Sequence, residues 1–476
     1  MVGSRSMLGN PVDIAFYTAL VIVAAIAAGH ALIHKRDPRS ATTWLLVIWI
    51  LPALGPVLYA LLGVNRVQRR AARLRRDMVR HRTASALPPQ EPGTHFAPLA
   101  RLVSKIVERP LLPGNAVEAL VDGAQAFPAM LQAIGRARSS IAMASYIFDS
   151  VGIGAEFIAA LAAAARRGVA VRVLIDDVDA RFSRSSAVKP LRRAGVPVAV
   201  FNPPLLPARL HAINLRNHRK ILVVDGVEGY TGGMNVDCRY WRPDEPSAGF
   251  RDLHFRLRGP VVAHLAEVFV DDWQFATDEA LRGEQWFPAL AAAGEVLARG
   301  IEAGPDESSE RVRWALIGAL NAAQRSVRVM TPYFIPDMAL ISELNGAALR
   351  GVEVDILMPE RSDLPHVHWA AFGQLWQVLE HGCRVWLSAG AFDHSKLMVV
   401  DGAYTLLGSA NWDARSLRLN FELNVECYSV ELGAHMEGLV LARRATAREV
   451  TLADVRARSL PVKLRDGVAR LFAPYL

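Results

Sequence analysis

The chain has 476 residues, of which 52% are hydrophobic and 21% charged, a composition that allows a large core and excludes a mainly disordered protein. Its formal net charge of +8 favours anionic partners, but charge alone does not choose between nucleic acid and acidic lipid. Three scattered cysteines, without CxxC or Cys/His spacing, indicate neither a disulfide framework nor a zinc site. We expect buried thiols in a reducing compartment at Cys238, Cys383 and Cys427.

Two apolar segments near the N-terminus are each long enough to cross a membrane. Ile14 to Ile33 and Ala41 to Val64 contain 20 and 24 residues without Asp, Glu, Lys or Arg. About 20 apolar residues in a helix span a hydrocarbon core, so we predict transmembrane helices at about 14–33 and 41–64. The first segment could instead be a cleaved signal peptide, and the pair could be a buried hairpin. Prolines in the second segment also permit a kinked or re-entrant path.

Basic residues around these segments predict the orientation of the chain. Eight arginines lie between Arg66 and Arg82, against three basic residues in the loop that separates the segments. The positive-inside rule then puts the bulk of the chain in the cytoplasm and the loop around Asp37 to Ser40 outside. The arginines either bind anionic headgroups or only set the topology. The proline-containing stretch 83–96 is predicted to be a stiff linker.

The remainder of the chain is an internal duplication. Strand-like runs at 141–148 and 327–334 are each followed by an Ala/Leu-rich helical stretch and a second strand-like run, at 167–174 and 350–357. Apolar runs that alternate with helices indicate α/β domains with mostly parallel sheets covered by helices. Two copies from one duplication are expected to pack about a pseudo-twofold axis, so that corresponding sites could meet at their interface.

One motif, H-x-K-x4-D-G, occurs once in each copy, with an offset of 176 residues at every position. Only six lysines occur in the whole chain, and two of them lie in these motifs. Chance would produce one such motif only about 0.01 times in a chain of this composition, so two aligned copies are a strong signal. The repeated residues are His218, Lys220 and Asp225 in the first copy and His394, Lys396 and Asp401 in the second.

The residues after each motif lysine are strand-like, and alternate residues of a strand share a face. Each motif histidine is therefore expected beside its lysine. The Asp-Gly that closes each strand is a turn signal, so the chain should return as a hairpin. Small residues there would let a substrate oxygen approach the backbone, and asparagine amides could donate to it. The candidates for binding a substrate phosphate are Gly232, Gly233, Asn235, Gly408, Ser409 and Asn411.

The complete pattern, H-x-K-x4-D-x6-G-[GS]-x-N twice in one chain, resembles the phospholipase D superfamily. The resemblance covers essentially the whole chain and narrows to the bacterial cardiolipin synthases. One departure is Phe250, where the family leads us to expect tryptophan; it bears on the acceptor pocket and leaves the motif residues intact. Besides the paired apolar segments, the stretches that carry this similarity are 110–115, 146–148, 217–220, 333–337, 408–417 and 471–476.

The resemblance implies a phosphatidyltransferase that makes cardiolipin from two molecules of phosphatidylglycerol by a ping-pong mechanism. One motif histidine would attack phosphorus to give a phosphatidyl-histidine, while the other protonates the departing glycerol and then activates the incoming hydroxyl. By analogy with the family we expect His218 to be the nucleophile and His394 the acid and base.

The remaining residues of the expected site would stabilise charge or hold the histidines. The motif lysines and asparagines would neutralise charge on the phosphate oxygens, so that no metal or other cofactor is required. The motif aspartates are included in the catalytic set, with the role of orienting a histidine or backbone groups. With the two histidines, the expected catalytic set comprises Lys220, Asp225, Lys396 and Asp401, and the expected phosphate-binding residues are Asn235, Asn411, Gly233 and Ser409.

The resemblance also implies a location and a domain plan. We expect a multi-pass protein of the bacterial inner membrane with cytoplasmic catalytic domains, acting on phosphatidylglycerol and anionic lipids and not on nucleic acid. The alternatives are a phospholipase D-type hydrolase, a transferase with another acceptor, a membrane-bound nuclease or a scaffold. The expected parts are a membrane anchor at 1–64, a basic segment and linker at 65–96, and phospholipase D-like domains at 97–285 and 286–476.

Several conspicuous polar residues outside the motifs receive weaker expectations. His366 and His368 lie near the acidic stretch 360–363 and are expected to be solvated loop residues rather than metal ligands. Glu422 and Asn424 follow the second motif within reach of the site, and a direct role stays open. The carboxylates that end one predicted strand are expected to be solvated; they are Asp176, Asp177 and Asp179.

Overall fold

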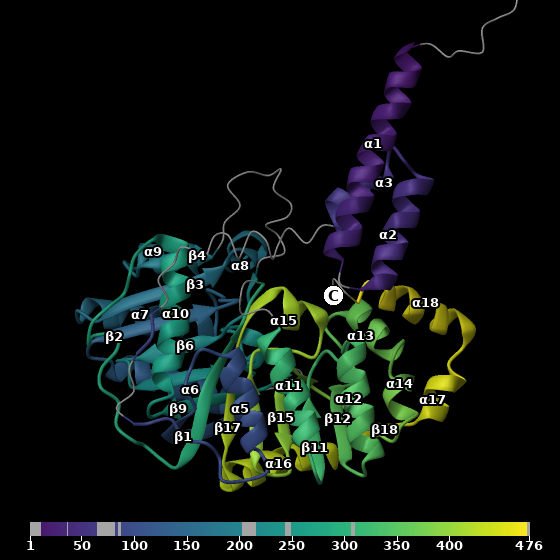
Figure 1. The fold of residues 1–476 in the computed structure, drawn as a ribbon. Helices are drawn as coiled ribbons and strands as arrows, with labels where there is room; N and C mark the ends of the chain where they lie inside the picture. Colours follow the sequence, from purple (N-terminus) through teal and green to yellow (C-terminus); the bar gives the residue numbers. More distant parts are fainter. Residues whose placement is uncertain are drawn as a thin grey trace, which may run out of the picture. The chain divides into compact units, whose positions relative to one another are not determined.

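The computed structural model describes residues 11–35, 37–63, 81–83, 87–201, 216–242, 249–305 and 310–473. The chain divides into two compact units, residues 1–70 and 71–476 (Figure 1). Of the arginines that were expected to set the topology, all except Arg82 lie outside the described residues.

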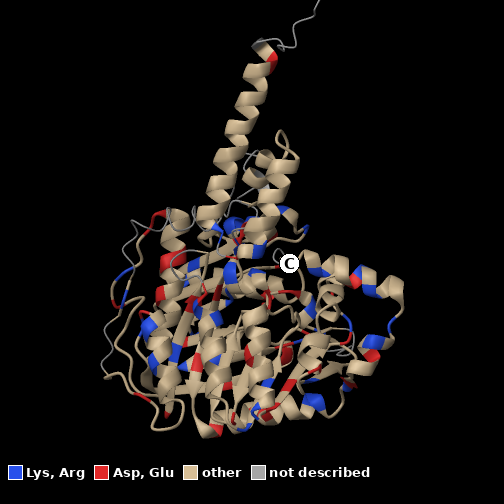
Figure 2. Cartoon of the chain, turned by 45° about the vertical axis from the view of Figure 1, so that its right-hand side comes forward, with Lys and Arg blue, Asp and Glu red and all other residues tan. Residues whose placement is uncertain are grey.

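The first unit contains one long apolar helix, α1 (Pro11–His34). Its portion Val12–His34 is, within the described part of the chain, the one helix long and apolar enough to cross a membrane. Figure 2 shows that this helix is almost free of charged residues, and Asp13 is its only acidic or basic residue apart from histidine. A 24-residue helix is about 36 Å long, which exceeds the roughly 30 Å of a hydrocarbon core.

The second apolar segment is not the continuous helix that the sequence predicted. It forms α2 (Pro38–Ile50), a turn, the short helix α3 (Gly55–Leu58) and a π-helix (Tyr59–Gly63). Prolines 52 and 56 cannot donate the backbone hydrogen bonds of a continuing helix, which explains the break.

After this break the chain folds back along α2 and α1. A Cβ on Gly55 would lie 2.3 Å from the Val47 carbonyl oxygen, so only glycine permits this close return. The Tyr59 hydroxyl then lies 2.8 Å from Nδ1 of His30, near the end of α1. At 13 residues α2 is about 20 Å long and too short to cross alone. The re-entrant alternative therefore fits the structure better than a second full span.

The second unit is built on one continuous sheet with helices on its faces (Figure 1). Its first half contains α5 (Ala97–Ile106), β1 (Leu112–Val121), α6 (Asp122–Arg136), β2 (Ser140–Ser145), α7 (Ile153–Arg166), β3 (Ala170–Asp176), α8 (Asp177–Phe182), α9 (Val188–Arg193), β4 (Val198–Phe201), β5 (Arg216–Asn217), β6 (Ile221–Val224), β7 (Glu228–Gly232), β8 (Phe250–Arg251), β9 (Leu253–Arg258) and α10 (Val262–Thr277).

The second half repeats this plan and adds helices at its end. It contains β10 (Val296–Ala303), α11 (Arg311–Ala322), β11 (Ser326–Met330), α12 (Met338–Leu349), β12 (Glu353–Pro359), α13 (Pro365–Phe372), α14 (Trp376–Leu379), β13 (Arg384–Ser388), β14 (Phe392–Asp393), β15 (Leu397–Val400), β16 (Tyr404–Gly408), α15 (Ala414–Arg418), β17 (Asn420–Tyr428), α16 (Val430–Arg444), β18 (Arg448–Val450), α17 (Leu452–Ala457) and α18 (Leu460–Leu471).

The strand order makes the duplication visible in three dimensions. The order is β18-β13-β12-β11-β15-β16-β17-β10-β1-β9-β7-β6-β2-β3-β4, so corresponding strands lie at equal distances on either side of the β10–β1 pair. The predicted α/β class with two pseudo-twofold-related halves is therefore confirmed. The sheet is mixed rather than mostly parallel, because parallel pairing along this strand order is limited to β2-β3-β4 and β11-β12-β13.

Burial on both faces explains why these strands are so apolar. Every residue of β2, β11, β15, β16 and β17 is buried, as is usual where helices cover both sides of a sheet. Each half has its own apolar cluster. Helix α5, which the sequence assigned to the first domain, packs its buried residues Leu99, Ala100 and Val103 into the cluster of the second half.

The described part of the predicted linker is attached to the second unit. The backbone amides of His81 and Thr83 donate to the carboxylates of Asp271 and Glu267, at 3.2 and 2.7 Å. Between them the Arg82 guanidinium lies within 4 Å of both carboxylates and of Glu302. Arg82 is thus paired inside the protein, and it is not available as a ligand for lipid headgroups.

Candidate active site

Both motifs lie at the edge of the sheet where the central parallel strands end. Strand β6 is antiparallel to β2 and pairs Ile221 with Ala144, which puts Lys220 beside the carboxyl end of β2. In the second half, β15 pairs Leu397 with Met330, the last residue of β11. Ligands of open α/β sheets usually bind at this edge, so the two motifs occupy a position suited to a substrate.

Two short parallel strand pairs cross between the halves and join the motifs. Strand β5, directly before His218, pairs with the start of β17, and the His218 amide donates to the Phe421 carbonyl at 2.9 Å. Strand β14, directly before His394, pairs with β8, and the His394 amide donates to the Arg251 carbonyl at 2.7 Å. Each histidine is therefore positioned by a strand of the opposite half.

This crossing gives each histidine a carboxylate from the other half. Nδ1 of His218 lies 3.0 and 3.1 Å from the two carboxylate oxygens of Glu422. Nδ1 of His394 lies 3.0 Å from Oδ2 of Asp252. The two carboxylates hold corresponding positions. Gly232 pairs with His254 and Gly408 pairs with Asn424, and each carboxylate lies two residues before that paired residue. The arrangement forms one composite site with two histidine–carboxylate pairs.

The two pairs differ in their aromatic neighbours. The Tyr240 hydroxyl lies 2.9 Å from Nδ1 of His394, so this nitrogen has both a carboxylate and a phenol as partners. At His218 the corresponding space holds no phenol hydroxyl within hydrogen-bonding distance among the described residues. The ring of Tyr146 instead contacts the edge of His218, with 4.8 Å between ring centroids, and lies 5.3 Å from the Lys220 ammonium. The pseudo-symmetric frame thus carries chemically unequal sites.

Both motif lysines are buried and fold back onto their own motif. The Lys220 ammonium donates to the His218 carbonyl at 2.8 Å, and the Lys396 ammonium donates to the His394 carbonyl. Burial lowers the pKa of Lys220 to about 7 and that of Lys396 to about 8, although Glu422 and Asp252 oppose the shift. Two ammonium groups held so close to neutrality would gain charge when an anionic phosphodiester binds.

Burial also shifts the pKa values of the two histidine–carboxylate pairs, and the two carboxylates shift in opposite directions. It lowers the pKa of His218 to about 4 and the pKa of His394 well below its usual value. Burial raises the pKa of Asp252 well above its usual range. For Glu422 burial acts in the same direction, but His218 and Lys220 outweigh it and lower the pKa. These shifts favour the protonated carboxyl at Asp252 and the ionised carboxylate at Glu422.

The predicted phosphate-binding residues fall into two groups. Asn235 accepts a hydrogen bond from the Ile147 amide through Oδ1, which leaves its NH2 group as the donor, and Asn411 is buried beside Lys396. These two stay candidates for phosphate. Gly232 and Gly408 have φ near +150°, and a Cβ on either would meet the neighbouring strand.

Gly233 and Ser409 lie directly beside the carboxylates of Asp252 and Glu422. A Cβ on Gly233 would lie 2.4 Å from the Asp252 carboxylate, so glycine makes room for that side chain. The Ser409 hydroxyl donates to Glu422 at 2.6 Å. The backbone amides of both residues already donate to the carbonyls of Leu253 and Leu423. These contacts support the two carboxylates, and the expected role of both residues in phosphate binding stays a prediction.

The motif aspartates lie outside the catalytic centre. Each aspartate is the fifth residue after its lysine along the strand, a distance of about 16 Å. The Asp225 carboxylate accepts the amides of residues 138–140, before β2, and the Asp401 carboxylate accepts those of residues 324–326, before β11. Both residues have φ near +50° at the turn. They orient backbone groups at the far edge of the sheet, which is one of the two roles expected for them.

Other residues also differ from their expected environments. Asp176 is buried and accepts the Asn217 amide at 2.7 Å, so it helps to fix β5 and hence His218. Asp177 and Asp179 are likewise buried and not solvated. His366 and His368 lie on helix α13 rather than in a loop, and no group of metal-ligating side chains occurs in the described part of the chain.

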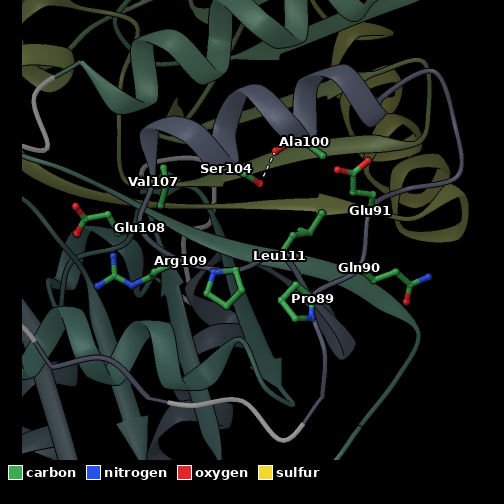
Figure 3. A pocket seen from close by; sticks show the side chains of 10 residues that line it. Pro89, Gln90, Glu91, Ala100, Ser104, Val107, Glu108, Arg109 and Leu111 are labelled. Carbon is green, nitrogen blue, oxygen red and sulfur yellow. Dashed lines mark hydrogen bonds between the residues drawn. The ribbon is translucent and has the colours of Figure 1, made fainter.

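A cavity of about 500 Å³ lies away from the motifs, between helix α5 and residues 89–91 and 107–111 (Figure 3). None of its lining residues belongs to the histidine–carboxylate pairs. Glu91 and Glu108 line it, and the Arg109 guanidinium is committed to Glu267 and Glu302 at 2.9 and 3.2 Å. Its acidic lining is unsuited to a phosphate, so cavity size does not identify the site here.

Sequence reasoning missed Asp252 and Tyr240 as members of the site. A signal for Asp252 was present, because Asp252-Leu253 and Glu422-Leu423 stand at corresponding positions relative to the hairpin glycines Gly232 and Gly408. The signal was hidden because Asp252 lies 19 residues after Gly233, whereas Glu422 lies 13 residues after Ser409. Tyr240 has no counterpart, since the offset of 176 leads to Ser416.

Comparisons with known proteins place this geometry in context. A family model described as "Cardiolipin synthase, PLD-like domain" matches residues 130–273 and 316–440, and one described as "Phospholipase_D-nuclease N-terminal" matches residues 20–63. "Cardiolipin synthase 2" of Staphylococcus epidermidis is 31% identical, over 93% of this chain and 94% of that protein. "Major cardiolipin synthase ClsA" of Bacillus subtilis is 31% identical, over 93% and 95%.

Among solved structures, phosphatidylserine synthase of Haemophilus influenzae has a similar fold. The TM-score is 0.62, and the match covers 79% of this chain and 100% of that one. At 14% sequence identity this similarity concerns the fold alone.

The contacts of Asp225 predict a structural role that can be measured. Replacement of Asp225 by Asn removes the charge that binds the preceding amides, and we expect the free energy of unfolding to fall by about 1–3 kcal/mol. Asp278 is a matched control, because it also has positive φ but is exposed. Denaturant titration of the detergent-solubilised protein should show a loss for Asp225→Asn and almost none for Asp278→Asn. Equal effects would contradict the assignment.

Proposed function

Because the chain belongs to the cardiolipin synthase family of phospholipase D-like proteins, we propose that it is a phosphatidyltransferase that makes cardiolipin and glycerol from two molecules of phosphatidylglycerol. The observation that carries the proposal is the crossed arrangement of His218 with Glu422 and of His394 with Asp252. Two histidines at one site suit a phosphoryl transfer that passes through a covalent intermediate.

His218 is suited to be the nucleophile of the first step. Its Nδ1–H donates to the ionised Glu422, which leaves the lone pair on Nε2 free to attack phosphorus. The lowered pKa keeps this ring neutral at physiological pH. A bond forms between Nε2 and phosphorus, the bond from phosphorus to the terminal glycerol oxygen breaks, and phosphatidyl-histidine results.

His394 is suited to supply the proton that the leaving glycerol needs. Nδ1 can accept a hydrogen bond from Tyr240 or from protonated Asp252, and either donor leaves the proton of the neutral ring on Nε2. As the departing oxygen takes that proton, Nδ1 takes the proton of Asp252, so the ring stays neutral and Nε2 is left with a free lone pair. Tyr240 is thus a positioning residue that favours one tautomer, and nothing equivalent acts on His218.

The second step returns the enzyme to its starting state. The hydroxyl of a second phosphatidylglycerol gives its proton to Nε2 of His394 and attacks phosphorus, and the phosphorus–nitrogen bond to His218 breaks. Lys220 and Lys396, with the amides of Asn235 and Asn411, stabilise the charge on the non-bridging oxygens in both steps. Water in place of the second lipid would give phosphatidic acid, so the products distinguish a synthase from a hydrolase.

We further propose that the catalytic unit lies on the cytoplasmic face of the bacterial inner membrane. If α1 crosses the membrane once and residues 38–63 re-enter, the loop at 35–39 and the arginines at 66–82 lie on one side. That side then holds eleven basic residues, against Arg5 before α1. The positive-inside rule favours a cytoplasmic position for the basic side.

Substitution of the histidines tests whether the site is composite. His218→Ala and His394→Ala should each lower the rate of cardiolipin formation from phosphatidylglycerol in detergent micelles by at least about 10³-fold. The double variant should be no slower than either single one, because residues that act as one unit are not additive. Half-maximal activity in a single variant would instead indicate two independent sites.

The same variants separate the two roles. With labelled phosphatidylglycerol, His394→Ala should accumulate a covalent lipid adduct, and His218→Ala should form none. The opposite pattern would exchange the roles of the histidines. Mass spectrometry of the labelled peptide identifies the residue that carries the adduct.

The lysine pKa values predict a falling alkaline limb in the pH profile. Values of kcat/KM should be level between about pH 5 and about pH 7, where His218 is neutral and both lysines are charged. Above about pH 7 the ammonium groups lose protons, so kcat/KM should fall. Because bound phosphate stabilises the ammonium form, the limb for kcat should lie at higher pH. A kcat/KM that stays level to pH 9.5 would contradict this, with circular dichroism as the control for folding.

The re-entrant hairpin predicts a topology with one crossing. In intact cells a membrane-impermeant thiol reagent should label Ser6→Cys, before α1, and should not label Ser40→Cys, after it. Permeabilised cells should label both, which is the control for accessibility. Labelling of Ser40→Cys in intact cells would show two full spans, as the sequence first suggested.

A further inference from the structure

The C-terminal helix α18 exposes an apolar stripe that nothing in the described chain covers. Leu460, Leu464, Val468 and Leu471 are spaced by four, four and three residues, so they lie on one face of the helix. These side chains are between 56% and 76% exposed, and Phe472 just beyond them is 57% exposed. An isolated exposed leucine is ordinary, but an ordered stripe of this kind indicates an interaction surface.

The opposite face of α18 is fixed to the enzyme. Helix α18 packs against α13 (Figure 1), with Asp466 and Ala469 buried between them. The Arg465 guanidinium lies 4.5 Å from the Trp369 ring, and Arg458 reaches Asp466 at 2.7 Å. These contacts hold the helix in one orientation. Because they involve the opposite face, the apolar stripe points away from the enzyme.

Basic residues flank this stripe on both sides. At 100° per residue, Lys463 and Arg470 lie along one border of the stripe and Arg465 along the other. All three are exposed, although the Arg465 guanidinium contacts the Trp369 ring and Asp466, the latter at 2.8 Å. The helix has a net charge of +2. Figure 2 shows basic segments in blue along the C-terminal helix. An apolar face bordered by basic side chains is typical of helices that lie in the interface of an anionic membrane.

The position of α18 connects this surface to the active site. Helix α13 follows the carboxyl end of β12, and β12 runs parallel to β11. The second motif lies beside the end of β11. Helix α18, packed on α13, therefore lies at the same edge of the sheet as the motif residues.

We propose that α18 is an interfacial helix that docks the catalytic unit onto the surface of an anionic lipid bilayer. Charge disfavours a second copy of the stripe as the occupant, because the basic borders of two copies would face each other. The inference rests on the proposed function for the choice of lipid, since phosphatidylglycerol would be both the surface and the substrate. Docking would hold the site against the membrane, so a lipid could enter without leaving it.

A position-specific fluorophore tests the docking without any assay of activity. The full-length protein, labelled at Leu464→Cys, is reconstituted into vesicles of equal parts phosphatidylglycerol and phosphatidylcholine that contain nitroxide-labelled lipid. The control is Val430→Cys on α16, which is 69% exposed and follows the opposite end of β17. Fluorescence at 464 should be quenched, and fluorescence at 430 should not.

Three outcomes of this experiment would overturn the proposal. These are equal quenching at both positions, no quenching at 464, or equal quenching at 464 in vesicles of phosphatidylcholine alone. Shielding of the 464 label that depends on protein concentration, without lipid quenching, would show that a second copy covers the stripe.

A charge substitution tests the consequence for turnover. Val468→Glu should lower the rate in vesicles by about tenfold, because the carboxylate must leave the interface. The same variant should keep its rate on short-chain phosphatidylglycerol in micelles, and Val430→Glu should be unaffected in both. Equal rates for the two variants in vesicles would overturn the proposal. A wild-type chain that makes no cardiolipin would contradict the proposed function, while the quenching result would still decide the docking.

Discussion

The hydrogen bonds between each motif histidine and a carboxylate of the opposite half are the constraint on which the site depends. They exist because two short parallel strand pairs, β5–β17 and β14–β8, cross between the halves. The continuous sheet through β10 and β1 fixes the positions of those strands. Neither half could orient its own histidine, so one half alone would contain a motif without a working site. Duplication and catalysis are therefore inseparable in this fold.

Within this symmetric frame the two histidines have become chemically different. The same strand position carries Glu422 in one half and Asp252 in the other. The small residue that contacts the carboxylate is Ser409 in the first case and Gly233 in the second. The Ser409 hydroxyl stabilises an ionised Glu422. The buried Asp252 carboxyl instead shares Nδ1 of His394 with the Tyr240 hydroxyl. Small differences around one nitrogen are sufficient to favour a nucleophile on one side and a proton donor on the other.

The sequence predicted the features that are local or repeated. The family, the α/β class, the duplication and the convergence of the two motifs follow from residues at fixed spacing, and the structure and comparisons agree. Features that depend on distant pairing were missed. The spacing between Asp252 and the hairpin glycine differs from the spacing in the second half, so the sequence repeat does not reveal its pairing with His394. Asp225 belongs to the motif, but the length of the strand places it far from Lys220. The return of the second apolar segment depends on packing around Gly55.

The buried lysines explain why the site favours an anionic substrate and why a position near the bilayer surface suits it. An ammonium in a buried site is costly unless an anion accompanies it. The acidic groups that act most strongly on Lys220 and Lys396 are Glu422 and Asp252, respectively. Of these two, Asp252 has its pKa raised well above the usual range by burial, which reduces the negative charge available to the lysines. A phosphodiester supplies that charge. A lipid headgroup bound there has its acyl chains still in the membrane, so a site of this kind works best close to the bilayer surface. The outward stripe of α18, at the same edge of the sheet, meets that requirement.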